Sequence, residues 1–323
     1  MVTELPAAPQ VETEHYTPPQ TPRACRAAQR PSLQDQALSW IAAGCQMAFG
    51  PRERTGLGIL TYHRIADPPA NRPRPTWNVR PERFQKQIAG LLKRGWQAWP
   101  LRQALHYAER ELPIPRKTFV VTFDVGYANV LLEACPVLTR LRVPATLFLS
   151  TAYLDSQEPF PGDDWEAAGV PGTPTDAWRF LTTDECRRLM GNGLIEIGSH
   201  TRHHRDFRDR PVELLADLKD NLNVLKDTFG IDQPSFAPSP VPTDERPTNL
   251  ELTQAARQAG TICCLTDEPR VIPLKETPFN WGRFTVSEYD TAATLAGKLG
   301  GWHTAVQGLG QDALDHRPRV QGP

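Results

Sequence analysis

Two kinds of hydrophobic pattern alternate along the chain from residue 57 onward. Short, nearly continuous apolar runs are typical of buried strands, and apolar residues recurring at helical spacing are typical of amphipathic helices. The strand-like runs lie at 57–63, 118–124, 144–150, 194–200, 234–237 and 261–266. The helical patterns between them lie at 81–95, 128–141 (with a break near Pro136), 182–193, 212–230 and 249–260. Helices that separate short buried strands favour a mainly parallel sheet, and six or seven such units favour a barrel.

The two ends of the chain differ from this alternating region. Residues 1–35 are rich in proline and polar residues, which predicts a disordered tail. A helix is expected over 36–55, the barrel domain over 56–305, and a flexible tail over 306–323. The N-terminal helix would cover an open end of the core or touch a membrane surface. Its lack of basic residues favours the first role.

Composition narrows the classes of function. The 323 residues carry 36 Lys and Arg against 37 Asp and Glu, and a net charge of −1 gives no electrostatic basis for binding nucleic acid. No apolar run is long enough for stable membrane insertion, and the first residues do not form a secretory signal. The six cysteines follow no metal or disulfide spacing, so we expect reduced structural thiols in a cytoplasmic protein.

Candidate chemistry gathers where three predicted strands end. His63 follows the first strand, Asp124 ends the second, and His200 and His204 come at the end of the 194–200 strand. Two imidazoles four residues apart can face one cation, and zinc accepts a carboxylate as a further ligand. A histidine pair in a loop is also commonly just solvated or hydrogen-bonded. Convergence of all three strand ends at one barrel mouth would favour a metal site.

The segments "TFDVG" at 122–126 and "HTRHH" at 200–204 resemble two motifs of the polysaccharide deacetylase family, the NodB homology domain of carbohydrate esterase family 4. The family motifs read T-F-D-D-G and H-[ST]-x-x-H. Their order and flanking segments also match, so the resemblance covers roughly residues 57–290. It implies a distorted (β/α)₇ barrel that removes acetyl groups from a carbohydrate by metal-assisted hydrolysis, a reaction at a non-peptide carbon–nitrogen bond when the group is N-acetyl.

The resemblance also implies residue roles. Asp124 would be the general base that activates water, and His200 and His204 would bind a divalent metal, zinc above all. His63 would line the pocket, and Arg283 would orient the catalytic carboxylate, although either could be purely structural.

Three departures from the family pattern touch the metal, the substrate groove and the acid. Val125 replaces the aspartate that serves as the third metal ligand, and valine cannot coordinate a metal. The segment at 235–242, "SFAPSPVP", lacks the aromatic residue and the glycine of the family's groove turn. The family's C-terminal Leu-x-His motif, which supplies the general acid, is missing, and His303 is the only late candidate.

These observations favour a divergent, TIM-barrel-like deacetylase whose metal binding is weak or absent. The alternative is a pseudoenzyme, a barrel that binds a glycan or a protein partner in exopolysaccharide assembly without catalysis. A phosphate-dependent or redox enzyme ranks last because no glycine-rich phosphate loop or dinucleotide fingerprint is present. The sequence identifies no protein partner.

Overall fold

The computed structural model describes residues 32–53, 56–68, 77–156, 158, 175–205, 207, 210–238, 249–273 and 275–307. Most of both predicted tails, and residues 239–242 of the altered groove segment, lie outside the described residues.

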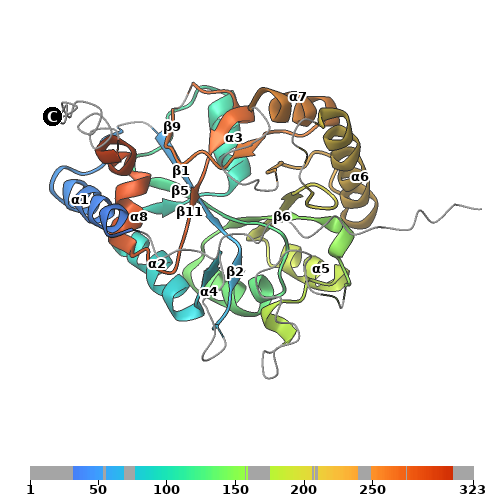
Figure 1. The fold of residues 1–323 in the computed structure, drawn as a ribbon, viewed down its shortest axis with the longest axis horizontal. Coiled ribbons are helices and arrows are strands. Elements are labelled where there is room, and N and C mark those ends of the chain that lie inside the picture. Colours follow the sequence, from blue (N-terminus) through green and yellow to red (C-terminus); the bar gives the residue numbers. More distant parts are fainter. Residues whose placement is uncertain are drawn as a thin grey trace, which may run out of the picture.

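A mainly parallel sheet runs through the centre of the molecule, with helices around it (Figure 1). The strand order is β11-β1-β5-β6-β7, and every pair along this path is parallel. These strands are β1 (Gly56–Tyr62), β5 (Thr118–Phe123), β6 (Ala145–Leu149), β7 (Ile195–Ser199) and β11 (Phe284–Thr285). Two short strands pair beside the path, β4 (Gln97–Ala98) with β5 in parallel and β9 (Ile272–Pro273) with β1 in antiparallel orientation.

Single bridges continue the parallel pairing beyond β7 and lead back toward β1. Ser199 of β7 bridges to Phe236, and Phe236 bridges to Cys264. Cys264 precedes β8 (Leu265–Thr266), which pairs with β10 (Trp281–Gly282). β11 begins two residues after β10 and pairs with β1. The order of the pairings is therefore that of a seven-segment barrel, distorted where bridges replace regular strands.

Both faces of the central strands are buried, which explains their continuous apolar runs. Along β5, Phe119, Val121 and Phe123 pack into the larger core cluster, while Val120 packs into a second cluster. In β6, Phe148 belongs to the second cluster, which includes residues from β1, β8 and β10. Together the two clusters bury both faces of these strands.

The helices form an outer layer, and several begin or end at recognisable capping residues. Those among the described residues are α1 (Leu33–Phe49), α2 (Pro81–Lys93), α3 (Leu101–Glu109), α4 (Cys135–Leu141), α5 (Thr183–Gly191), α6 (Pro211–Phe229), α7 (Asn249–Ala259) and α8 (Ala292–Leu299). Proline at the first position starts α2 and α6, where its missing N–H costs nothing. Gly230 ends α6 in the left-handed conformation, with φ of 70°.

The predicted break near Pro136 corresponds to a change of helix type. Residues Val130–Ala134 form a π-helical turn, and α4 begins at Cys135. Pro136 is thus the second residue of α4 and follows directly after the π-helical turn.

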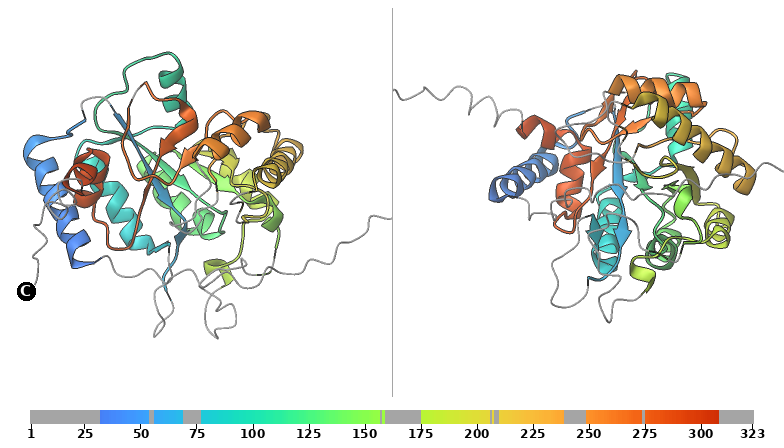
Figure 2. Two further views of the ribbon diagram at one scale, coloured as in Figure 1. Left: turned by 45° about the horizontal axis from the view of Figure 1, so that its top comes forward. Right: turned by 45° about the vertical axis from the view of Figure 1, so that its right-hand side comes forward.

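The N-terminal helix begins at Leu33, three residues earlier than expected, because Ser32 caps it. The Ser32 hydroxyl accepts from the Asp35 N–H, and the Asp35 carboxylate accepts in return from the Ser32 N–H. α1 packs against α8 on one side of the sheet, and α6 packs against α7 on the opposite side (Figures 1 and 2). None of the described helices is long and apolar enough to cross a bilayer.

Candidate active site

The residues that the sequence singled out meet at the carboxyl ends of the parallel strands. His63 follows β1, Asp124 follows β5, and His200 follows β7. Arg283 lies between β10, which pairs with β8, and β11, which pairs with β1. Parallel strands place their carboxyl ends at one edge, where α/β proteins build their sites. Convergence of these side chains therefore follows from the topology.

Asp124 is held by a buried ion pair. Nη1 of Arg283 donates to Oδ1 of Asp124 over 2.8 Å, and the exposed fractions of the two side chains are 0% for Arg283 and 1% for Asp124. Nη2 of Arg283 donates to Asp267, which follows β8, over 2.7 Å. Burial alone would lower the pKa of Arg283, but the two carboxylates outweigh it and raise the pKa above its usual value. A permanent positive charge therefore faces Asp124.

The second carboxylate oxygen of Asp124 is directed toward His63. Its Oδ2 lies 4.0 Å from Nε2 of His63, which is buried. Burial lowers the pKa of His63, and the carboxylates of Asp124 and Asp267 oppose that shift only in part. The imidazole is therefore neutral at neutral pH.

His200 is oriented as a ligand histidine would be. Its Nδ1 lies 2.9 Å from the carbonyl oxygen of Ala237. A carbonyl only accepts hydrogen bonds, so Nδ1 carries the proton and Nε2 presents its lone pair. Among the described residues, that buried Nε2 has no hydrogen-bond partner. Burial, with the charge of Arg283, lowers the pKa of His200 to about 3.

His204 completes a pair of neutral imidazoles. Its ring centroid lies 5.0 Å from that of His200. Its backbone N–H donates to the Thr201 hydroxyl, which closes the turn between the two histidines. Burial, reinforced by His200 and His63, lowers the pKa of His204 to about 3. Neutral imidazole is the form that binds a metal.

Within the described residues, the site offers two imidazoles to a divalent cation but no third ligand. The tautomer of His200, its unpartnered Nε2 and the adjacent ring of His204 fit such an ion. However, no group of three or more His, Cys, Asp or Glu side chains that could hold a metal is present in the part of the chain that the structure describes. The structure thus gives no complete metal site.

Val125 lies in the turn after β5, at the position of the expected third metal ligand. Its φ is +79°, an outlier for a β-branched residue. Its side chain packs with Tyr127, Phe180 and Tyr153 in a small aromatic cluster. Trp77, Thr201 and His204 also have positive φ, so four of the eight such non-glycine residues described belong to the site or its rim. Strained backbone of this kind is concentrated where the surrounding structure determines a functional geometry.

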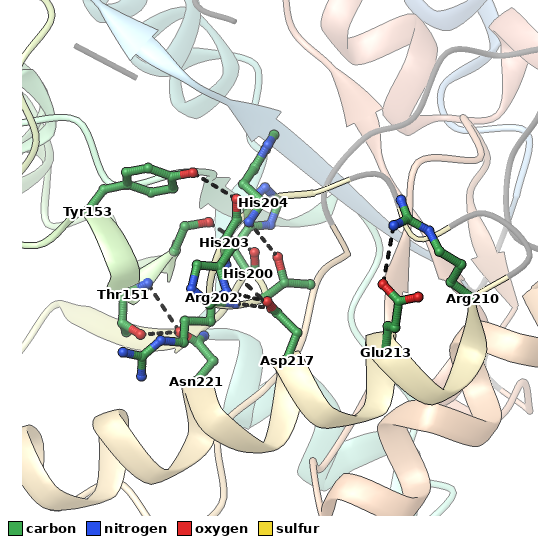
Figure 3. Close-up of polar contacts among 12 residues, drawn as sticks. Thr151, Tyr153, His200, Arg202, His203, His204, Arg210, Glu213, Asp217 and Asn221 are labelled. Atoms are coloured by element: carbon green, nitrogen blue, oxygen red, sulfur yellow. Dashed lines mark hydrogen bonds and ion pairs between the residues drawn. The ribbon is translucent and has the colours of Figure 1, made fainter. Parts of the chain in front are cut away.

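Two polar residues of α6 hold the histidine loop in place (Figure 3). Asp217 accepts the backbone N–H groups of Arg202 and His203, and its other oxygen contacts Nδ1 of His203. The Asn221 amide donates to the Ser199 hydroxyl and to the Leu149 carbonyl, at the ends of β7 and β6. The sequence analysis missed both residues. Their signal was available, since Asp217 and Asn221 are polar at buried positions of an amphipathic helix.

The altered segment after α6 still supports the site as far as it is described. The Ala237 carbonyl accepts the hydrogen bond from Nδ1 of His200, and the Ala237 N–H donates to the Ser199 carbonyl. His303, by contrast, does not reach the site. The indole N–H of the adjacent Trp302 donates to the Gly50 carbonyl at the C-terminal end of α1. The late general-acid candidate is therefore not part of this group of residues.

Comparison with known proteins shows which family this chain resembles. The family model of polysaccharide deacetylase matches residues 112–261, which include both Asp124 and the histidine pair. That stretch, just under half of the chain, therefore resembles a polysaccharide deacetylase domain.

Two relatives by sequence point to the same family. The chain is 26% identical over 155 residues to poly-β-1,6-N-acetyl-D-glucosamine N-deacetylase of Escherichia coli (strain K12). That match spans 48% of this chain but only 22% of the relative. YxkH of Bacillus subtilis (strain 168) is 22% identical over 245 residues, which span 76% of this chain and 73% of YxkH.

Solved structures share the fold. IcaB from Ammonifex degensii superimposes with a TM-score of 0.61 at 21% identity, over 76% of this chain and 98% of IcaB. A de-N-acetylase from Aggregatibacter actinomycetemcomitans gives a TM-score of 0.61 at 17% identity, over 75% of this chain and 99% of that protein. These similarities confirm the predicted fold, a distorted barrel of the NodB type.

Proposed function

We propose that this protein hydrolyses acetyl groups on an amino-sugar polysaccharide or a related acylated glycan, with metal chemistry weakened by Val125. The observation that carries the proposal is the meeting of Asp124, His200 and His204 at one edge of the strands, with Nε2 of His200 left unpartnered among the described residues. A relative named as an N-deacetylase of poly-β-1,6-N-acetyl-D-glucosamine supports the substrate class.

Each side chain has a role that its contacts suit. Arg283 occupies Oδ1 of Asp124, so Oδ2 remains to take a proton from the attacking water. The proton that Oδ2 takes from water is the one the departing amine needs, and His63, with Nε2 4.0 Å from that oxygen, would relay it. In this assignment His63 carries the proton only in passing, because its lowered pKa leaves the imidazole neutral at rest.

A divalent cation held by His200 and His204 would polarise the acetyl carbonyl and favour ionisation of water. Zinc is the metal that two imidazoles with an oxygen donor favour. Loss of even an outer partner of a metal ligand costs roughly 10–100-fold in affinity or activity, so loss of the carboxylate at position 125 should cost at least that.

The second candidate is a glycan-binding barrel without catalysis. The packing of Val125 among aromatic side chains favours it, because that arrangement fills the third ligand's place with an apolar cluster. Residence in the cytoplasm remains a prediction.

The two functions are separated by metal analysis and acetate release. Protein purified without chelator would be analysed for bound zinc and incubated with an acetylated chito-oligosaccharide, with Asp124→Asn as the control. Acetate release that depends on Asp124 and on added zinc supports hydrolysis. Binding of the oligosaccharide with no acetate release at saturating zinc would favour the binding barrel.

A further inference from the structure

An exposed tryptophan lies beside the candidate catalytic group. The Trp77 ring stacks on His63, with centroids 5.0 Å apart and planes inclined by 27°. His63 is 7% exposed, whereas Trp77 is 41% exposed, one of the few large apolar side chains open to solvent away from α1. His63 covers one face of the indole, so the exposed surface belongs to its other face and edge.

The backbone holds the indole in this position. Trp77 has φ of +57°, a conformation that a bulky residue adopts at a cost. Its carbonyl accepts the N–H of Arg64, at the start of the pairing between β2 (Arg64–Ile65) and β3 (Asn78–Val79). The Asn78 amide donates to the Ala66 carbonyl and ties the same two segments together. A strained conformation maintained by several contacts is a reason to look for a function.

We propose that the outer face of Trp77 is a binding platform for a pyranose ring of the glycan. A flat, rigid and partly exposed aromatic surface suits the apolar C–H face of a sugar, and such rings characterise small-molecule sites. Only the indole ring itself separates this outer face from His63, whose Nε2 lies 4.0 Å from Oδ2 of Asp124. A sugar stacked there therefore lies next to the unit whose acetyl group reaches Asp124.

The substrate class in this inference rests on the proposed function, but the platform itself does not require catalysis. Trp77 acts by positioning the glycan. A residue that only shielded His63 from water would be equally effective with any apolar side chain of similar bulk. A stacking platform needs an aromatic plane, and that difference decides the test.

The experiment titrates an N-acetylglucosamine oligosaccharide into the full chain by calorimetry and measures acetate release on the same samples. Trp77→Leu keeps the apolar cover and removes the plane, and Trp77→Tyr restores an aromatic plane. Trp40→Ala, an exposed tryptophan on α1, is the matched control. We expect Trp77→Leu to raise Kd, and KM where there is turnover, by roughly tenfold with kcat nearly unchanged. Trp77→Tyr should remain near the wild-type value, as should Trp40→Ala.

The outcomes separate the platform from the chemistry. If Trp77→Leu loses binding while the wild type releases no acetate, the platform stands and the hydrolase proposal fails. Wild-type affinity in Trp77→Leu, with or without turnover, would overturn the platform. So would a wild-type protein that does not bind the oligosaccharide at all.

Discussion

The buried pair of Asp124 and Arg283 makes a large, measurable contribution to stability. Replacing Arg283 with alanine would leave Asp124, 1% exposed, as an uncompensated buried charge. Breaking a buried pair in this way costs roughly 3–5 kcal/mol. Asp267 adds little to that loss, because its 20% exposed side chain can turn toward water once Arg283 is gone. Against a typical stability of about 5–15 kcal/mol, the change would remove much of the margin.

Urea unfolding followed by circular dichroism measures this loss. Arg187→Ala is the matched control, because Arg187 pairs with Asp184 on the surface, with exposed fractions of 55% and 86%, and should cost less than about 1 kcal/mol. Arg283→Lys keeps the charge but not the two-pronged geometry, so it should lie between the wild type and Arg283→Ala. The reasoning is refuted if Arg283→Ala unfolds at the same urea concentration as the control.

Asp124→Asn tests whether the pair serves stability or catalysis. If the pair is a structural remnant, meaning that it stabilises the fold but no longer takes part in catalysis, this variant should also lose several kcal/mol of stability, because Arg283 loses its buried partner. Unchanged stability together with abolished acetate release would instead make Asp124 a catalytic group, and the remnant interpretation would be wrong.

Three further predictions concern the turn and the histidines. Val125→Asp should raise zinc affinity by at least about tenfold in a calorimetric titration, since it returns a carboxylate to a two-histidine site; unchanged affinity would mean that position 125 is not the missing ligand. The pKa values of His200 and His204 are about 3 in the folded protein, below the value near 6.5 in the unfolded chain. The unfolded chain therefore binds more protons as the pH falls below 6.5, and each histidine should lower the free energy of unfolding by up to about 1.4 kcal/mol per pH unit of acidification. Urea midpoints between pH 7 and pH 4.5 check this, and His200→Gln should flatten the slope. Gly126→Ala should destabilise the fold by more than about 1 kcal/mol in the same assay, because φ is +110° and a Cβ would meet the Leu149 side chain at 2.8 Å.

Local patterns predicted the central strands and most helices. The runs at 118–124 and 144–150 correspond to β5 and β6 because strands buried on both faces are apolar throughout. Helix ends could be predicted from the sequence where a residue type marks them, as Pro81 does at the start of α2 and Gly230 at the end of α6. The predicted strand at 261–266 shortened to β8, Leu265–Thr266, because only those residues have a partner of regular geometry in β10.

Other elements have too weak a local sequence pattern to be predicted. The sequence analysis did not anticipate α3 or α8. Both are short, and α8 begins at a capping box between Thr291 and Thr294 rather than at a long apolar pattern. The segment at 281–285 forms two strands of two residues each, one paired with β8 and the other with β1. Its role depends on partners far away in the chain.

The chemical identity of the site was set by residue types and spacing, and its assembly by the fold. Asp124, His200 and His204 could be named from their motifs and their positions at strand ends, because the carboxyl ends of parallel strands meet at one edge. The Trp77 stack on His63 and the support of the histidine loop by Asp217 depend on contacts between segments whose separation no periodicity encodes. Hydrophobic period and capping chemistry are local properties that a sequence displays directly. Which loops face each other is decided only when the strands close around a common core.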